Sequence, residues 1–452
     1  MDLTLSAPHA VRAGAVETTA VWHRWSWRLI CAALLLLPFR ATVGPAVLNL
    51  EWFDVLACAF LVTATAAGVW RTTAPQQVLG WVAVYVAAML PSLLNTAHLG
   101  GSCAELIKTA YVACVAFALA RWASEPSAWK RLVRAFVISV GAIILFSLGV
   151  WVYATLSGHV PARFALAEAI PNVGRMVRVK ATLQTFAMLA NYLTMGIPML
   201  AAYAAATSSR PRTMCWLILI AGLLAAATTG SNGLVGCCLA AAIVAPRTTR
   251  WDRIGRAALV LLVVGVFLFA QVASTAAILG VRASTRPMPL ATTSGLPPQV
   301  FPDPVDGGKQ LTVQVSYVWA IYGLLHKLAW ETWREHPWIG IGVGEFSSVS
   351  ARAAAMGRLN SAWDPHSTWF GALAETGLIG LLGLAAMWIA LLRRAAAGQR
   401  AGPTAGDWRV RAPLAGLVGL LVNSLHADIM HFRFLWIGIA WLVAARSRPT
   451  ME

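Results

Sequence analysis

Long apolar runs of about 20 residues, separated by short polar breaks, recur through this chain. An apolar helix of that length spans the hydrocarbon core of a bilayer. Soluble domains carry about 25% charged residues, whereas this chain is 12% charged and 58% hydrophobic. The pattern predicts an all-α polytopic membrane protein with about 12 transmembrane helices. They are expected near 29–47, 52–70, 78–95, 104–120, 135–156, 183–206, 214–228, 231–245, 257–280, 366–392, 413–427 and 430–445.

Basic residues are distributed unevenly between alternate connections. Those on one side hold 21 of the 35 lysines and arginines against six acids, and those on the other side hold 14 bases against 12 acids. Because basic residues accumulate on the cytoplasmic side of a membrane, both termini are predicted to be cytoplasmic. The net charge of +17 is then a signal of topology, and it calls for no nucleic-acid partner.

Histidines show the opposite bias, which points to an extracytoplasmic working surface. Seven of the nine are predicted to lie outside or at outer helix ends: His98, His159, His326, His336, His366, His426 and His431. The predicted organisation is a cytoplasmic segment, a bundle of about nine spans, a periplasmic loop domain, further transmembrane helices and a tail. Their ranges are 1–28, 29–280, 281–365, 366–446 and 447–452. Within the loop domain, residues 283–310 are proline-rich, and helices are expected over 311–336 and 345–358.

His366 is the first candidate for chemistry. It follows Pro365 at the mouth of the span predicted over 366–392. The positive end of a helix lowers the pKa of an imidazole and favours its neutral form, which is the form that a general base requires. The position alone fits a capping or interfacial histidine equally well.

Basic residues near the outer ends of helices are the second candidates. Residues 157–182 contain Arg163, Arg175, Arg178 and Lys180. Guanidinium groups bind phosphate through paired hydrogen bonds, so this set suits the phosphate or diphosphate of a lipid headgroup. The alternative is ordinary arginines whose stems lie along the membrane surface. In 333–346, Arg334 and His336 are expected at the same rim, unless that segment is only a structural turn.

Charged residues inside or beside the spans are further candidates. Glu375 lies nine residues inside its span, where a carboxylate is costly and is a functional candidate. We favour a supporting role in which Glu375, hydrogen-bonded to a helix neighbour, holds the helix of His366 in place. Glu105 and Lys108 are predicted to form an ion pair. A loose cluster comprises His426, Asp428, His431 and Arg433.

Several enzyme and transporter signatures are missing from the sequence. It contains no Walker loop, no GxSxG, no HExxH and no Asp-rich metal motif, which argues against an ATP-driven pump or a metalloprotease. The seven cysteines show no metal-binding spacing, and we expect them to act as small apolar residues. No metal and no cofactor are predicted. No pair of internal repeats supports a secondary transporter.

Two motifs resemble the O-antigen ligase / Wzy polymerase superfamily of bacterial envelope glycosyltransferases. HPWIGIGVGEF (336–346) is similar to the family's loop motif, and HSTWFGALAETGLIG (366–380) to its histidine motif, with Ser367 in place of the usual asparagine. Weaker similarity extends over 177–200 and 421–442. One departure is Ser231-Asn232-Gly233, where many members have Ser-Arg-Gly.

The resemblance implies transfer of a glycan from an undecaprenyl-diphosphate carrier to an acceptor hydroxyl at the periplasmic face of the bacterial inner membrane. It implies His366 as the general base and an anomeric centre that is inverted. Without the Ser-Arg-Gly arginine, the diphosphate would be held by basic residues among Arg178, Lys180, Arg175, Arg282 and Arg334. His336, Glu375 and Asp364 would support the site. The other partners would be membrane lipids.

The identity of the acceptor separates the possible functions. The leading hypothesis is an O-antigen ligase, whose acceptor is lipid A–core. A Wzy-type polymerase would instead use another carrier-linked glycan, and an oligosaccharyltransferase would use a protein. A transporter of lipid-linked sugars is the hypothesis from another class. It would require polar residues through the middle of the membrane, whereas here they gather at the outer rim.

Overall fold

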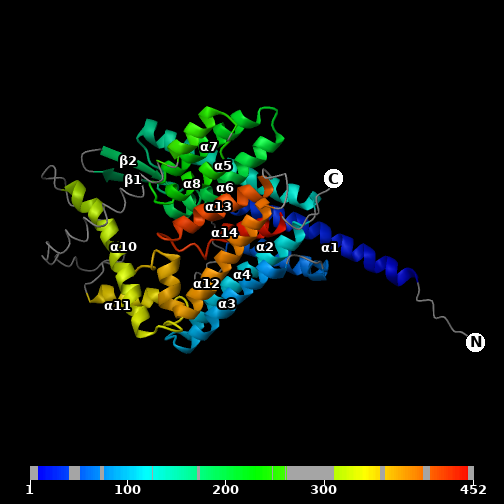
Figure 1. The fold of residues 1–452 in the computed structure, drawn as a ribbon, viewed down its shortest axis with the longest axis horizontal. Coiled ribbons are helices and arrows are strands. Elements are labelled where there is room, and N and C mark those ends of the chain that lie inside the picture. The colour runs from blue at the N-terminus through cyan, green and yellow to red at the C-terminus, as the bar shows by residue number, and fades with distance from the viewer. Residues whose placement is uncertain are drawn as a thin grey trace, which may run out of the picture.

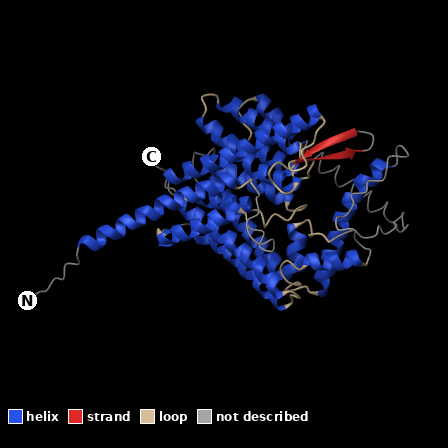
Figure 2. Cartoon of the chain, turned by 180° about the vertical axis from the view of Figure 1, so that it is seen from behind, coloured by secondary structure: helices blue, strands red, loops and turns tan. Residues whose placement is uncertain are grey.

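The computed structural model describes residues 9–39, 51–71, 76–124, 126–170, 174–246, 248–259, 261, 310–356, 362–400 and 408–445. Within these ranges the chain is a helical bundle with a two-stranded hairpin at one end (Figure 1, Figure 2). The helices before the hairpin are α1 (His9–Leu36), α2 (Trp52–Ala66), α3 (Gln76–Met89), α4 (Leu99–Trp122) and α5 (Pro126–Ser157). Those after it are α6 (Phe186–Thr207), α7 (Pro211–Ala227), α8 (Leu234–Val244), α10 (Gln310–Glu335), α11 (Phe346–Ala355), α12 (Thr368–Arg400), α13 (Trp408–Asn423) and α14 (Arg433–Ala444). Short 3-10 helices cover Val69–Arg71 and Leu90–Leu94.

The prediction of a helical, membrane-type protein is confirmed, but the count of 12 spans is not supported. Among the described residues, four helices are long and apolar enough to cross a membrane: Leu99–Trp122, Ala128–Ser157, Phe186–Thr207 and Thr368–Ala396. Other apolar helices are shorter, and α14 has only 12 residues. A helix of that length rises about 18 Å, less than the hydrocarbon core of about 30 Å. Most of the span predicted over 257–280 lies outside the described residues.

The helices predicted in the loop domain are present, and one hairpin was not expected. Helices α10 and α11 match the predictions over 311–336 and 345–358. Strands β1 (Ala165–Ile170) and β2 (Gly174–Val179) pair antiparallel, with Leu166 opposite Arg178. An isolated two-stranded hairpin is marginally stable, and the tertiary contacts that hold this one are invisible in local sequence. One of them joins the amide of Val179 to the carbonyl of Thr228 at 2.9 Å.

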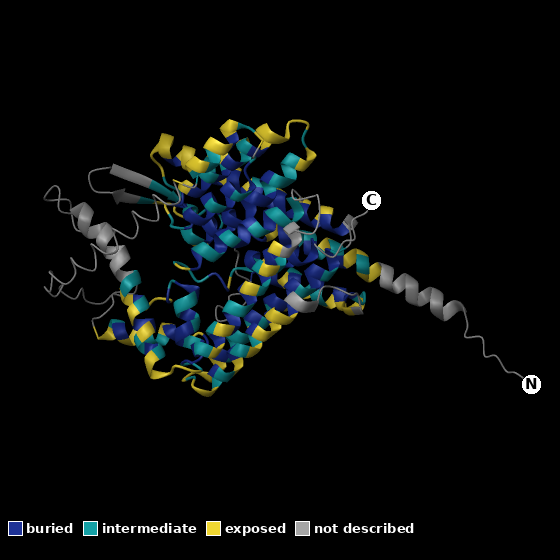
Figure 3. Ribbon diagram, in the orientation of Figure 1, coloured by how far each residue is buried: buried dark blue, intermediate teal, exposed yellow. Residues whose placement is uncertain are grey.

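Helix α14 lies in the interior of the bundle, and Figure 3 shows the buried residues gathered there. All of its residues from Phe434 to Ala444 are buried, and both Trp436 and Trp441 are almost inaccessible. Large apolar side chains are instead exposed on the outer faces of α2, α4 and α5, where Leu145 is 73% exposed. Exposed apolar surface of this extent is expected to contact lipid.

Helix ends that the charge pattern assigns to one side do meet in space. On the side predicted to be cytoplasmic, Arg212 on α7 pairs with Asp252 at 2.9 Å. There Arg411 on α13 also donates to the carbonyl of Ile243 at the end of α8. Figure 1 shows the hairpin, α10 and α11 at the opposite end of the bundle from the start of α1. These contacts support the relative sidedness of the helix ends. The compartment that each side faces stays a prediction.

The two sequence motifs form one interlocked backbone unit. Helix α12 is interrupted at Gly377, which has φ 64° and ψ −163°. The glycine segment 336–346 lies against this interruption. Four backbone hydrogen bonds join them: Ile341 N to Ala374 O (3.1 Å), Gly342 N to Glu375 O (3.0 Å), Leu378 N to Pro337 O (2.9 Å) and Ile379 N to Trp338 O (3.1 Å).

Glycine is required at this crossing because the two backbones approach too closely for a side chain. A Cβ atom at Gly377 would lie 2.4 Å from the carbonyl carbon of Trp338. A Cβ atom at Gly340 would lie 2.4 Å from the backbone of Glu375. The crossing therefore fixes the loop that carries α10 and α11 to the first half of α12, which His366 precedes.

Candidate active site

His366 lies at the start of α12 in a constrained conformation. Its φ is 49°, in the left-handed region that costs a non-glycine residue about 1–3 kcal/mol and recurs at functional sites. Its ring meets the ring of Tyr322 edge to face, with centroids 5.1 Å apart, and lies 5.6 Å from the ring of Trp363. The side chain is half-buried. Two aromatic neighbours and the strained backbone thus hold the imidazole in place.

The connection between α13 and α14 holds the beginning of the histidine helix. The amide of Thr368 donates to the carbonyl of Ser424 at 3.0 Å, and its hydroxyl donates to the carboxylate of Asp428 at 3.3 Å. The indole of Trp369 donates to the hydroxyl of Ser424 at 2.8 Å. Residues 424–428 are thus bonded to the first turn of α12, so they position His366 from a distant part of the sequence.

The surroundings of His366 favour a neutral imidazole. Burial lowers the pKa of His366, and the nearby carboxylates of Asp364 and Asp428 offset only part of this effect. His326 lies close enough to His366 and His426 to interact electrostatically, and burial lowers the pKa of His326 to about 4. Burial also lowers the pKa of His426. The site therefore contains three uncharged histidines at neutral pH. The sequence pattern predicts His326 and His426 on this side of the protein, but it does not place them beside His366.

Arg178 reaches the same neighbourhood from strand β2. Its Nε donates to the carbonyl of Thr229 at 3.0 Å, its Nη2 donates to the carbonyl of Gly230 at 3.3 Å, and its guanidinium lies 4.3 Å from the ring centre of Phe186. Burial raises the pKa of Tyr322, and the nearby charge of Arg178 partly opposes that rise. Tyr322 contacts His366. This tyrosine therefore lies near both Arg178, the predicted phosphate-binding residue, and His366, the predicted base.

The other predicted basic ligands are not gathered in the same way. Lys180 is half-buried just after β2, and Arg175 is on β2 opposite Ala169. Arg282 lies outside the described residues. Arg334 and His336 are exposed at the end of α10 and are not among the cavity-lining residues described next.

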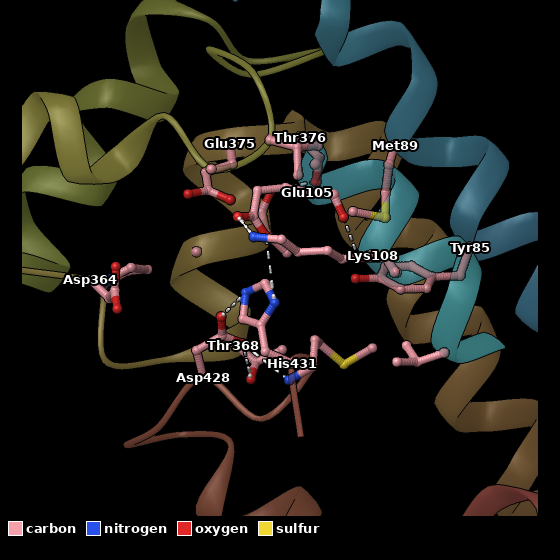
Figure 4. A pocket seen from close by; sticks show the side chains of 18 of the residues that line it. Tyr85, Met89, Glu105, Lys108, Asp364, Thr368, Glu375, Thr376, Asp428 and His431 are labelled. Atoms are coloured by element: carbon pink, nitrogen blue, oxygen red, sulfur yellow. Dashed lines mark hydrogen bonds and ion pairs between the residues drawn. The ribbon is translucent and has the colours of Figure 1, made fainter. Parts of the chain in front are cut away.

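A cavity of about 410 Å³ lies beside the outer half of α12 (Figure 4). Its walls come from α2, α3, α4, α11, α12, the start of α14, the glycine segment and the connections before α12 and α14. The charged residues that line it are Asp54, Glu105, Asp364, Glu375 and Asp428 together with Lys108, His431 and Arg433. These elements begin or end on the side predicted to be extracytoplasmic, and whether the cavity is the working surface stays a prediction.

Ion pairs connect the polar residues of the cavity. The predicted pair is confirmed, with Lys108 Nζ 2.7 Å from Glu105 Oε1. His431 Nε2 lies 3.0 Å from Asp428 Oδ2, and this carboxylate raises the pKa of His431 above its ordinary value. Figure 4 shows Lys108, His431 and Glu375 pointing into the same space.

Glu375 faces the cavity and also contacts the loop. Its Oε1 accepts a hydrogen bond from the amide of Phe346, the first residue of α11, at 3.2 Å. The sequence predicts that Glu375 is hydrogen-bonded to a helix neighbour. The hydrogen bond from Phe346 instead joins α12 to the end of the glycine segment. A supporting role for Glu375 is compatible with this contact and stays a prediction.

The loose C-terminal cluster separates into different contacts in the structure. His426 lies near His326, and the Asp428–His431 pair lines the cavity. Arg433 instead forms a paired interaction with Asp54, from Nε to Oδ1 at 2.8 Å and from Nη2 to Oδ2 at 2.6 Å. Asp54 is 379 positions away in sequence, so no local pattern identifies it as the partner.

Part of the chain matches a known protein family. Residues 213–385 match the family model described as O-antigen ligase. The matched region extends from α7 into α12, and it includes the glycine segment and His366. Arg178 and the connection that positions α12 lie outside it. No curated protein matches the chain.

Proposed function

We propose, on the premise that this chain carries the domain of the O-antigen ligase/Wzy superfamily, that it is an O-antigen ligase-type membrane glycosyltransferase. It moves a glycan from undecaprenyl diphosphate to lipid A–core at the periplasmic face of the bacterial inner membrane. The observation that carries the proposal is the placement of His366. The histidine is constrained at the start of α12 inside the matched region, and Arg178 lies close to its neighbour Tyr322.

The arrangement supports a direct displacement. Neutral His366 accepts the proton of the acceptor hydroxyl as the oxygen attacks the anomeric carbon of the glycan. The new glycosidic bond forms while the bond from that carbon to the diphosphate oxygen breaks. The diphosphate leaves as an anion, so it needs charge stabilisation and no general acid. Attack opposite the leaving group inverts the anomeric centre, and a retained configuration in the product linkage would contradict this step.

Arg178 is assigned to the departing diphosphate. Its guanidinium is bonded to the carbonyls of Thr229 and Gly230, immediately before Ser231-Asn232-Gly233. Many members of the superfamily have an arginine where this chain has Asn232. A guanidinium from the hairpin therefore lies at the same turn, and it is the best candidate to replace the missing one. Lys180 and Arg175 belong to the same segment and would add positive charge.

Replacing Arg178 with alanine is expected to lower transfer about 100-fold, because one preorganised donor to a developing anion contributes about that factor. Arg178→Lys should retain part of the activity, since it keeps the charge but not the paired geometry. Transfer is measured with purified full-length protein, carrier-linked donor and lipid A–core. Arg210→Ala, at an exposed arginine just before α7, is the matched control and should keep wild-type activity. If Arg178→Ala transfers glycan at the wild-type rate, Arg178 does not stabilise the departing diphosphate.

A strain lacking the protein distinguishes the ligase from the runner-up polymerase. Loss of a ligase leaves long carrier-linked chains and a bare lipid A–core. Loss of a polymerase leaves core capped by single repeats. Unchanged lipopolysaccharide together with an unglycosylated envelope protein would indicate a protein-directed enzyme. If purified protein gives no transfer but moves carrier-linked glycan across vesicles, the transporter hypothesis replaces all three.

A further inference from the structure

We propose that the cavity beside α12 binds an uncharged, hydroxyl-rich sugar unit at the end of the acceptor, apart from the arginine assigned to the diphosphate. This inference rests on the proposed function and extends it to the class of acceptor. The cavity volume of about 410 Å³ falls within the range of small-ligand sites, which is about 300–1,000 Å³. One or two sugar rings are ligands of that scale.

The lining of the cavity matches the hydrogen-bonding chemistry of a sugar. Hydroxyl groups donate strongly to carboxylates, and Glu105, Asp364 and Glu375 present carboxylates to the cavity. Hydroxyl-bearing residues lie among them: Thr109, Tyr111, Ser347 and Thr376. Glu105 is already oriented by its 2.7 Å contact with Lys108, so its geometry is set before a ligand arrives.

The charge balance selects against an anionic ligand. Five acidic residues line the cavity against Lys108, His431 and Arg433. Arg433 is bonded to Asp54 and lies 3.4 Å from Glu51, while His431 is paired with Asp428. A phosphate in this space would meet three cationic side chains that are each already paired with a carboxylate, which disfavours it relative to a neutral sugar. The donor diphosphate is thereby assigned to Arg178, and the acceptor sugar to the cavity beside α12.

The cavity also adjoins the segment that carries the proposed base, although His366 itself is not in its lining. Asp364, Pro365 and Thr368 flank His366 in the chain, and all three line the cavity. The carboxylates of Asp364 and Asp428 are close enough to influence the charge state of His366. A sugar that fills the cavity therefore lies beside the segment that leads into α12, while the ring of His366 contacts Tyr322 and Trp363 outside the lining.

Filling the cavity tests the proposal without removing a polar group. Ala372 lines the cavity from α12, so Ala372→Phe places a ring in the space. Ala386→Phe is the matched control, because Ala386 is half-buried on the same helix and does not line the cavity. Ser347→Phe, at an exposed position of the lining, is the second variant if Ala372→Phe does not fold. Full-length protein in nanodiscs is studied by saturation-transfer NMR with methyl glucoside, methyl galactoside, methyl mannoside and glucose 6-phosphate.

The expected result is saturation transfer to at least one neutral glycoside in wild type and in Ala386→Phe. It should be about tenfold weaker in the cavity-filling variant, a loss that matches one or two hydrogen bonds to charged groups. Glucose 6-phosphate should give the weaker signal in wild type. Absence of binding by all three glycosides, equal binding in Ala372→Phe, or preference for the phosphorylated sugar overturns the proposal.

Two further measurements separate this inference from the proposed function. In the transfer assay, Ala372→Phe should raise the KM for the acceptor about tenfold and leave the KM for the donor unchanged. His366→Ala should leave glycoside binding unchanged. If wild type binds glycosides in the cavity but transfers no glycan, the proposed function fails and the binding site stands. If transfer is normal and Ala372→Phe has an unchanged KM for the acceptor, the proposed function stands and the proposed binding site fails.

Discussion

Replacing His366 with alanine is expected to lower glycosyl transfer by about 10²–10⁴-fold, the usual contribution of a positioned general base. His326, which lies near His366, is not expected to replace it, because its ring is stacked on Phe370 with centroids 4.4 Å apart. The variant should still bind the carrier-linked donor, since Arg178 is held by backbone carbonyls of another segment. Transfer and donor binding are measured separately on purified full-length protein.

The control for this variant is an exposed histidine outside the site. His159→Ala, in the connection before β1, should keep wild-type activity and wild-type thermal stability. His366→Gln keeps a polar side chain of similar reach but cannot take up a proton at neutral pH, so it should be as inactive as the alanine variant. Activity above about a tenth of wild type in both variants would rule out the base assignment.

The pH dependence of transfer gives an independent test of the same residue. Burial lowers the pKa of His366 below the ordinary value of 6.5, so the imidazole is neutral at pH 7 and gains a proton only as the pH falls through its lowered pKa. The acidic limb of kcat/KM should therefore have its midpoint below 6.5. Asp364 raises the pKa of His366, so Asp364→Asn should move that limb to still lower pH. A midpoint above 6.5, or an unmoved limb in Asp364→Asn, would contradict this electrostatic account.

Replacing Gly377 with alanine is expected to destabilise the protein by about 4 kcal/mol or more, among the largest effects of a single methyl group. Its φ of 64° with ψ of −163° falls in a region that is essentially restricted to glycine. The added Cβ would lie 2.4 Å from the carbonyl carbon of Trp338 and 2.6 Å from the amide nitrogen of Gly340. Both obstacles are backbone atoms, so the loop would have to separate from α12. The four hydrogen bonds that join the two motifs would be lost with it.

The measurement is the thermal stability of detergent-extracted protein and the fraction recovered as a single monodisperse species. Gly149→Ala is the matched control, because a methyl group added at this position on α5 would have no atom within 4 Å. That variant should be neutral or more stable by about 1 kcal/mol, since alanine is the better helix former. If Gly377→Ala and Gly149→Ala are equally stable, the close crossing does not hold the loop to α12.

Much of the candidate site could be predicted from the sequence because it depends on local patterns. The apolar period identified the helices. The charge asymmetry assigned Arg212 and Arg411 to the same side as the helix ends that they contact in the structure, and the sidedness itself stays a prediction. His366 and the glycine segment stood out because a histidine at a helix mouth and closely spaced glycines each impose a local requirement. The Glu105–Lys108 pair followed from a spacing of three residues on one helix.

The tertiary structure alone decided which distant residues meet. Asp54 pairs with Arg433, and the first turn of α12 is bonded to Ser424 and Asp428. Neither partner follows from spacing, because helix packing and not local propensity brings these segments together. The hairpin is a further case: its strands depend on contacts with the α7–α8 turn, and they bring Arg178 to Tyr322. The sequence by itself therefore determined a helical membrane protein with His366 at a helix mouth. The packing of the bundle determined the cavity beside it, because the walls of that cavity come from helices far apart in the chain.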